Sequence, residues 1–237
     1  MKKYLYLVLF LLIGGMLHAQ SWRFAPTFGV QVATVNYSSA YKKEITSFNS
    51  AYSNASVQTA PTLKVQIGAL FDYPFSDRLS FRTGLVYNGK GGAMTYKVSD
   101  YGVTAKFKGT NSINYLELPL IVSTAVGTND FRLEIGVVGG LAVSAKTKYT
   151  GSESGNYYAE STLKLPIGND KVDEVKPTEL GFSVSVVKQL EVNRSPLEIG
   201  VHIQPSLSKW NSSSKYQPDY FARNLLIGVK AVYLLDL

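Results

Sequence analysis

The segment from Leu63 to Phe71 reads LKVQIGALF, with a lysine and a glutamine set between apolar residues. Because a β-strand sends successive side chains to opposite faces, Leu63, Val65, Ile67, Ala69 and Phe71 share one face. Single charges amid apolar stretches recur near Arg82, Glu117, Arg132, Glu134, Glu179, Glu198 and Lys230. A closed barrel in lipid needs this pattern, since its apolar side chains point outward and its polar ones into the lumen.

Eight segments have the character of strands, and helical spacing is not sustained anywhere in the mature chain. They are residues 22–36, 61–73, 79–90, 113–126, 131–146, 177–190, 197–209 and 223–237. Short connections rich in Pro, Asp, Asn, Gly and Ser alternate with long polar ones. This order predicts an all-β fold: an eight-stranded antiparallel up-and-down transmembrane β-barrel with short periplasmic turns and long outer loops. The alternative is a soluble periplasmic barrel, although the outward face of such a barrel would carry charges.

The first residues have the features of a secretory signal peptide. Lys2 and Lys3 precede an unbroken apolar run over residues 5–13, and Ala19 ends a plausible cleavage site. The run is shorter than the roughly 20 residues that a helical span needs. We therefore predict a signal peptide over residues 1–19, a barrel domain over residues 20–237, a location in the cell outer membrane and two periplasmic termini.

The amino-acid composition limits the kinds of site and partner that the protein can have. The chain has no cysteine, which removes disulfides, thiol chemistry and cysteine metal sites. Its formal net charge is +7, and an exported chain rarely meets nucleic acid, so the excess favours attraction to anionic lipopolysaccharide. The 16 tyrosines suit the aromatic belts found at membrane interfaces. Neither a cofactor nor a metal is predicted.

The inward-facing charges form a balanced set, which favours pairing because an unpaired buried charge is very costly. The predicted lumen network consists of Lys64, Arg82, Glu117, Arg132, Glu134, Glu179, Glu198, His202 and Lys230. We expect a lower cluster of Arg82, Arg132, Glu134, Glu198 and Lys230, and an upper one between Lys64 and the two glutamates Glu117 and Glu179. The lumen of an eight-stranded barrel is just wide enough for its own side chains, so we interpret the network as a polar plug. A proton path, an ion path or a ligand site is the alternative.

Catalysis is not predicted. His202 shares the inward phase with Glu198 and Gln204, and Ser206 is near in sequence, but no nucleophile motif surrounds them. The stretch Gly89-Lys90-Gly91-Gly92 lacks the strand–loop–helix context of a phosphate-binding loop and is interpreted as a strand-to-loop exit.

The second long loop is basic and aromatic. Its candidate binding residues are Tyr96, Lys97, Tyr101, Lys106, Phe107 and Lys108. Tyrosine and lysine together suit a glycan, a lipopolysaccharide phosphate or a partner protein. A solvated loop, or a strand extension standing above the membrane, is the alternative.

The run Tyr115-Leu116-Glu117-Leu118-Pro119-Leu120 resembles the signature of the PorT-like outer-membrane β-barrel family of the Bacteroidota. Residues 84–87, followed by Lys90-Gly91, fit the same family. The resemblance implies an eight-stranded barrel similar to the OmpA transmembrane domain, with Glu117 inside and Pro119 bending its strand. The named member of the family is an accessory of type IX secretion and gliding. The chain departs from the usual barrel-assembly signal in ending on Leu237 rather than on an aromatic residue.

These observations support an integral outer-membrane barrel with a structural, binding or accessory role, secretion-associated in one version, exerted through its outer loops. The expected partners are outer-membrane lipid and lipopolysaccharide, and in the accessory version another envelope protein. The alternative function is a narrow gated channel or transporter through the ion-paired lumen.

Overall fold

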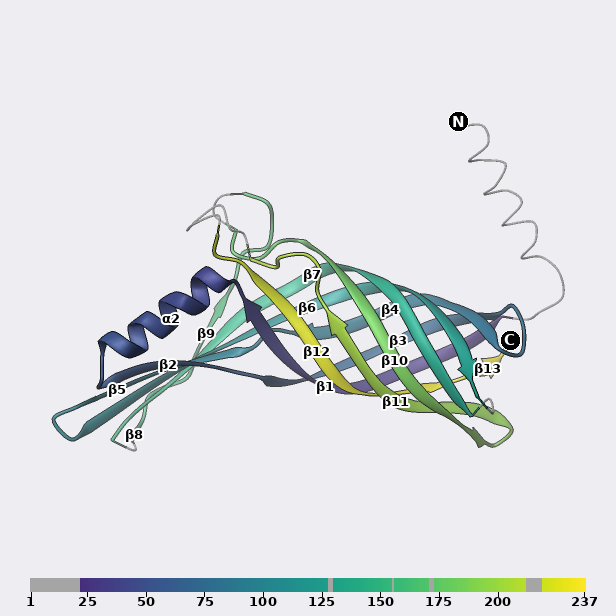
Figure 1. Cartoon of the computed structure of the whole chain (residues 1–237), viewed down its shortest axis with the longest axis horizontal. Helices are drawn as coiled ribbons and strands as arrows, with labels where there is room; N and C mark the ends of the chain where they lie inside the picture. Colours follow the sequence, from purple (N-terminus) through teal and green to yellow (C-terminus); the bar gives the residue numbers. More distant parts are fainter. Residues whose placement is uncertain (1–21, 128–129, 155, 171–172, 212–218) are drawn as a thin grey trace.

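The computed structural model describes residues 22–127, 130–154, 156–170, 173–211 and 219–237. It shows a barrel with a narrower extension at one end and a single helix beside that extension (Figure 1). The predicted signal peptide, residues 1–19, lies outside the described residues.

Eight strands close into a ring in which every neighbouring pair is antiparallel. In order around the ring they are β1 (Arg23–Tyr37), β3 (Thr62–Pro74), β4 (Leu79–Lys90), β6 (Val103–Val126), β7 (Phe131–Glu153), β10 (Thr178–Val192), β11 (Ser195–Pro205) and β12 (Ala222–Tyr233). The pairing of β12 with β1 returns the ring to its start. The short strand β13 (Leu235–Asp236) also pairs with β1, near the end of the barrel opposite the extension (Figure 1). The ring confirms the predicted eight-stranded, up-and-down barrel.

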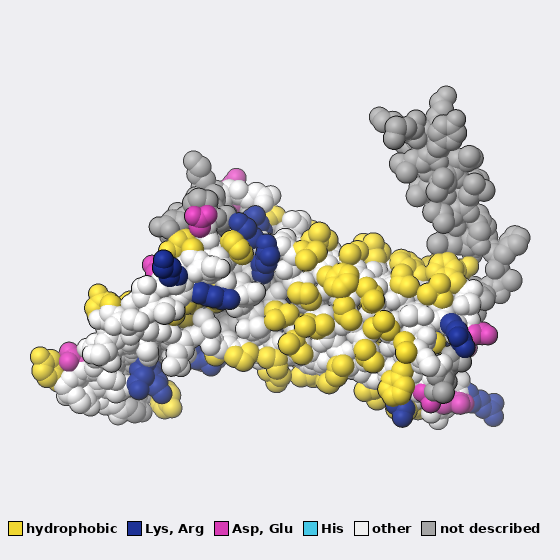
Figure 2. Space-filling model, viewed as in Figure 1, with side chains coloured by type: hydrophobic (Ala, Val, Ile, Leu, Met, Phe, Trp, Pro, Cys, Tyr) yellow, Lys and Arg dark blue, Asp and Glu magenta, His cyan; other side chains and the backbone are white. Residues whose placement is uncertain are grey.

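The barrel wall is apolar on its outer surface and charged inside. Leu63, Val65 and Ile67 on β3 are exposed, whereas Arg82 and Glu134 are almost completely buried. Figure 2 shows apolar side chains over the visible barrel wall, with most of the visible charged side chains gathered toward the two ends. The barrel strands therefore have the predicted arrangement, with apolar side chains on the outside and charged side chains in the lumen.

The predicted long loops are partly strands. β6 and β7 stay paired beyond the barrel as far as Ala105 and Glu153. This ribbon is widened by β2 (Ala55–Ala60), β5 (Ala93–Asp100), β8 (Asn156–Tyr157) and β9 (Ser161–Lys164). We call this part, with the upper halves of β6 and β7, the extension sheet. Most of the predicted second long loop forms β5 and the upper part of β6, so of the alternatives left open for it, the strand extension is the one that the structure shows.

One helix contradicts the expectation that helical structure is missing. Helix α2 (Ser39–Ala51) lies beside the extension sheet (Figure 1). Ser38 caps its first turn, since the Ser38 hydroxyl accepts a hydrogen bond from the Tyr41 amide at 3.3 Å. The helix has no fully buried residue, and only Ala40, Tyr41 and Ile45 are half-buried, so its apolar side is short. Among the described residues, no helix is both long and apolar enough to cross a membrane.

Candidate functional site: the lumen and the extension sheet

Arg82 is the centre of the lower charge cluster. Its Nε lies 2.6 Å from Asp72 Oδ1, and its Nη2 donates to Glu198 Oε1 at 2.8 Å. The same guanidinium contacts Glu134, which in turn pairs with Lys230. Arg132 approaches Glu198 at 3.8 Å. The structure thus brings together all five residues that were assigned to the lower cluster.

Sequence reasoning missed two members of this cluster. Asp72 is fully buried and pairs with Arg23 as well as with Arg82. Gln66 and Asp72 are both buried and share one phase of β3, so continuing the alternation to the end of that strand would have placed Asp72 inside. Its position beside a turn made it resemble a turn residue.

The upper cluster forms around Lys90, not around Lys64 as predicted. Lys90 Nζ lies 2.7 Å from Glu117 Oε1 and 3.1 Å from Glu179 Oε2. Lys64 instead donates to Ser112 Oγ at 2.6 Å. Ser112 alternates along β6 with the buried Ile113, so it belongs to the outward-facing set. Lys90 escaped the sequence analysis because its glycine neighbours suggested a loop, although it shares the inward phase of Arg82 on β4.

His202 belongs to a neutral hydrogen-bonded layer. Its Nε2 lies 2.9 Å from Gln31 Oε1, and neighbouring Gln204 donates to Glu117 Oε1 at 3.0 Å. Ser206, which was considered as a nucleophile, donates its hydroxyl to Glu179. The cavity beside His202 has a volume of about 40 Å³, which holds no more than a few water molecules.

An apolar layer lies above the upper charges. It contains Val35, Ile113, Tyr115, Ala145, Leu165, Val175, Trp210 and Ala222. Tyr115 connects the two levels, because the Lys90 ammonium group lies 5.1 Å from the centre of its ring. Along the inward phase of β6 the order is therefore charge at Glu117, then apolar side chains at Tyr115 and Ile113.

The extension sheet separates the predicted loop residues onto two faces. Tyr96 lies opposite Phe107, and Lys97 lies opposite Lys106 in the next register position. Tyr96 and Phe107 thus share one face, and Lys97, Lys106 and Lys108 share the other. Tyr101 is in the turn between β5 and β6 and is 99 % exposed. The six residues do not form one site.

The basic side of the sheet continues the outward phase of the barrel wall. Lys146 on β7 lies opposite Ser112 and also opposite Lys164 on β9. We call Lys97, Lys106, Lys108, Lys146 and Lys164 the lysine face; all are exposed, and none has an acidic partner among the described residues. The upper three line a cavity of about 550 Å³ with Ser56, Gln58, Thr95, Thr150, Gly151, Ser152 and Tyr157.

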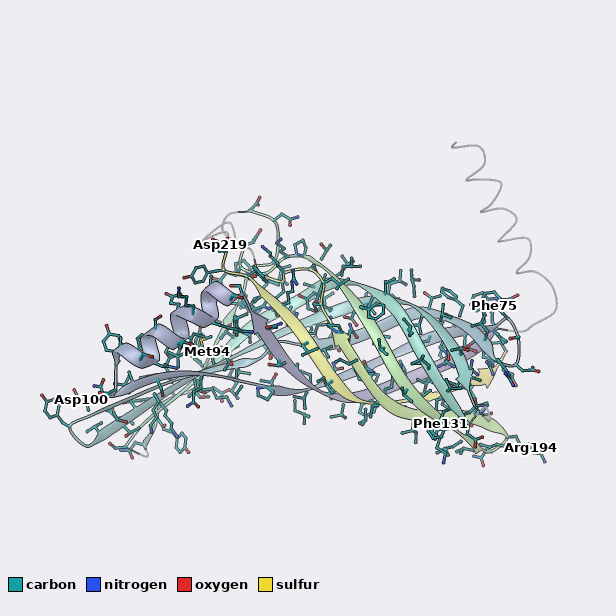
Figure 3. All side chains as sticks on the ribbon, in the orientation of Figure 1. Phe75, Met94, Asp100, Phe131, Arg194 and Asp219 are labelled. Carbon is teal, nitrogen blue, oxygen red and sulfur yellow. The ribbon has the colours of Figure 1, made fainter. Side chains whose placement is uncertain are left out.

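The opposite side of the sheet faces α2 across a second cavity of about 510 Å³, here called the aromatic pocket. Met94, which Figure 3 places between α2 and the sheet, is part of its lining. The other lining residues are Tyr37, Tyr41, Tyr96, Phe107, Gly109, Asn111, Thr147, Tyr149, Trp210, Asn211, Tyr220, Phe221 and Ala222. Because Trp210 and Ala222 also belong to the apolar layer, that layer forms part of the pocket wall.

The family comparison matches this architecture. Residues 18–210 fit the family of the outer membrane protein β-barrel domain. The chain belongs to this outer-membrane family. No curated protein matches the chain.

Several solved outer-membrane barrels are similar in structure. Ail of Yersinia pestis, solved in complex with the heparin analogue sucrose octasulfate, is 9% identical with a TM-score of 0.33; the match covers 90% of this chain and 99% of Ail. OprG of Pseudomonas aeruginosa is 11% identical with a TM-score of 0.36, over 94% of this chain and 99% of OprG. Neisserial surface protein A is 11% identical with a TM-score of 0.31, over 90% of this chain and 97% of that protein.

In an outer-membrane barrel, the apolar outer wall faces lipid and the extension sheet stands clear of the membrane. The lysine face begins just beyond the lipid-facing wall. Ser112, the partner of Lys146, is about 13 Å along β6 from the outward-facing Leu116, at a rise of about 3.3 Å per residue. The lowest lysines therefore follow the apolar wall on the side of the extension sheet.

Proposed function

We propose that this protein is a non-conducting outer-membrane barrel that binds the phosphate groups of lipopolysaccharide through its lysine face. In this proposal the extension sheet lies outside the cell and both termini are periplasmic. The observation that carries the proposal is the lysine face itself: five exposed lysines, free of acidic partners among the described residues, on one face of a sheet that continues the lipid-facing wall.

The electrostatics of this surface favour an anion. Lys97 and Lys106 are cross-strand neighbours, and so are Lys146 and Lys164. Like charges directly opposite each other destabilise a sheet. An anion bound between the two lysines of a pair would relieve their electrostatic repulsion. Lysine binds phosphate as a compact point charge, which suits a flexible glycolipid surface.

The interior supports a binding role rather than conduction. Arg82 and Lys90 are held by carboxylates at two levels, and the apolar layer lies above the upper level. An ion crossing the lumen would have to break these pairs and displace the apolar side chains. That cost supports a plug over the alternative of a gated channel.

Binding to lipopolysaccharide in lipid nanodiscs tests the proposal. Replacing Lys108, Lys146 and Lys164 with glutamine should weaken binding at least about tenfold, and wild-type binding should weaken as salt rises because exposed charges are screened. Replacement of Lys42, Lys43 and Lys188, three exposed lysines elsewhere, is the charge-matched control. Equal loss in both triple variants, or undiminished binding of dephosphorylated lipopolysaccharide, would contradict the proposal.

An accessory role beside another envelope protein is the second form of this proposal. The run from Tyr115 to Leu120 supports membership of the PorT-like family, and the extension sheet offers an edge and a tip to a protein partner. A pull-down from detergent-solubilised outer membranes tests it. A partner held by the wild type should be lost when residues 93–110 are replaced by a two-residue turn, and retention of that partner would contradict it.

A further inference from the structure

The aromatic pocket differs in chemistry from the lysine face on the other side of the same sheet. None of its described lining residues is Asp, Glu, Lys, Arg or His. Its volume of about 510 Å³ is within the usual range for small-molecule sites, which are mostly apolar with a few well-placed polar groups. Phosphate would find no counter-ion among these described lining residues.

The pocket wall is ordered by contacts between its own aromatic side chains. Tyr37 stacks on Tyr41 with ring centres 4.7 Å apart, and Tyr220 meets Tyr41 edge-on at 5.7 Å. The Tyr41 hydroxyl lies 3.6 Å from the sulfur of Met94, so helix and sheet touch across the pocket. Burial raises the pKa of Tyr41 to about 12, which keeps its hydroxyl neutral at physiological pH.

Several polar groups of the pocket have partners within the protein. Thr147 donates to Asn111 Oδ1 at 2.7 Å. Asn211 uses both ends of its amide, donating to Tyr220 O at 2.9 Å and accepting from Ala222 N at 2.8 Å. These internal bonds occupy Thr147 and the Asn211 amide, so among the lining groups it is chiefly tyrosine hydroxyls and the Trp210 indole that face a ligand.

Trp210 carries a buried polar group without a partner in the described part of the chain. Its side chain lines the pocket and only 7% of the residue is exposed, yet its indole N–H has no hydrogen-bond partner among the described residues. A buried donor without a partner is costly, and a ligand that brings an acceptor removes that cost.

We infer that the aromatic pocket is a binding site for a small, neutral, largely apolar molecule that carries one hydrogen-bond acceptor for the Trp210 indole. The ligand packs its apolar part against the rings of Tyr37, Tyr96, Phe107 and Tyr149. This site is separate from the phosphate-binding role proposed above, because it lies on the opposite face of the extension sheet.

The chain offers a direct spectroscopic test. It has two tryptophans, so Trp22→Phe leaves Trp210 as the only indole. The probe is Prodan, a neutral naphthalene with a ketone acceptor, titrated into this variant in nanodiscs while energy transfer from Trp210 is recorded. The expected result is a saturable transfer signal.

Gly109 allows the pocket to be filled without disturbing the sheet. A Cβ at Gly109 would meet Tyr149 at 3.5 Å, an ordinary contact, and the residue lines the pocket. Gly109→Leu should weaken Prodan binding at least about tenfold, as expected when several apolar contacts are lost. Thr110→Leu, one residue along β6 and on the other face, is the matched control and should leave binding unchanged.

Two further comparisons decide the ligand class. Anilinonaphthalene sulfonate, a probe of similar size with a fixed negative charge, should bind at least about tenfold more weakly, because none of the described lining residues carries a positive charge. Trp210→Phe should weaken Prodan binding about fivefold, the equivalent of one net hydrogen bond, as followed by Prodan emission.

Equal binding of the two probes, or full binding by Gly109→Leu, would overturn the inference. Glutamine at Lys108, Lys146 and Lys164 should leave Prodan binding intact, so failure of one proposal is distinguishable from failure of the other.

Discussion

At the scale of single residues, the alternation of side chains along the strands predicts most of the charged residues in the lumen. Glu117, Glu134 and Glu198 follow from the period of two along their strands, and all three are buried. Lys90 and Asp72 follow the same rule but sit at strand ends, where glycine and proline neighbours suggested loops. Lys64 departs from the predicted inward phase, since its side chain donates to Ser112 of the outward-facing set. The sequence indicates which side of a strand a residue occupies. The partner of a long side chain also depends on which strands lie beside it.

Arg82 is the residue whose loss should cost the most. It faces Asp72, Glu134 and Glu198, so Arg82→Met leaves three buried carboxylates short of positive charge. We expect the free energy of unfolding to fall by about 3–5 kcal/mol, as when one partner of a buried ion pair is removed. Urea unfolding in lipid vesicles measures the change. Lys188→Met, at an exposed position near Phe131, is the control and should change it by less than about 1 kcal/mol. An Arg82→Met protein as stable as the wild type would show that these carboxylates are held without Arg82.

Gly200 occupies a point where two strands approach closely on the inner wall. A Cβ there would lie 2.0 Å from Val186 O and 2.5 Å from Val187 Cα, so backbone would have to move. Gly200→Ala should lower the free energy of unfolding by about 1–3 kcal/mol. Gly139 is the matched control, because a Cβ at Gly139 meets nothing within 4 Å. The same urea titration compares the two variants. Equal stability of the two alanine variants would show that the backbone near Gly200 adjusts to the added methyl group without loss of stability.

At the scale of elements, the strands inside the membrane were predictable and those beyond it were not. The predicted segment 113–126 ends with β6 at Val126, but β6 begins ten residues earlier, at Val103. The alternation continues beyond the wall, with Tyr96 and Phe107 on one face and Lys97 and Lys106 on the other, but the turn at Tyr101 and the many polar residues gave this segment the composition of a loop. Helix α2 was not predicted because its apolar side is short: only Ala40, Tyr41 and Ile45 are half-buried, and the rest of the helix is exposed.

Helix α2 is held by its cap as well as by the packing of Tyr41. Ser38 is buried and its amide donates to Phe221 O at 2.9 Å, while its hydroxyl caps the first turn. Ser38→Ala should destabilise the helix by about 1 kcal/mol and raise its opening about fivefold. Limited trypsin digestion at Lys42 and Lys43 reports this opening as a faster cleavage rate. Ser50→Ala, in the last turn, is the control; equal rates in the two variants would argue against a role for the cap.

At the scale of the whole molecule, the closed ring and its filled interior predict an electrically silent barrel. The wild type should carry no steady current in planar bilayers, because the apolar layer remains above the upper charges even when those charges are altered. Glu117→Gln and Lys90→Gln should be silent as well, and so should Lys64→Gln, whose side chain lies outside this cluster. Discrete openings in the wild type that change with Glu117→Gln would instead favour the gated channel.

The uninterrupted pairing of β6 and β7 also has a mechanical side. These two strands run without a break from the short-turn end of the barrel into the extension sheet, with a single register shift beside Asn114 and Tyr115. A force applied near the tip of this ribbon is transmitted along the two paired strands into the barrel wall. A molecule bound to the extension sheet is therefore coupled mechanically to the barrel through continuous strands.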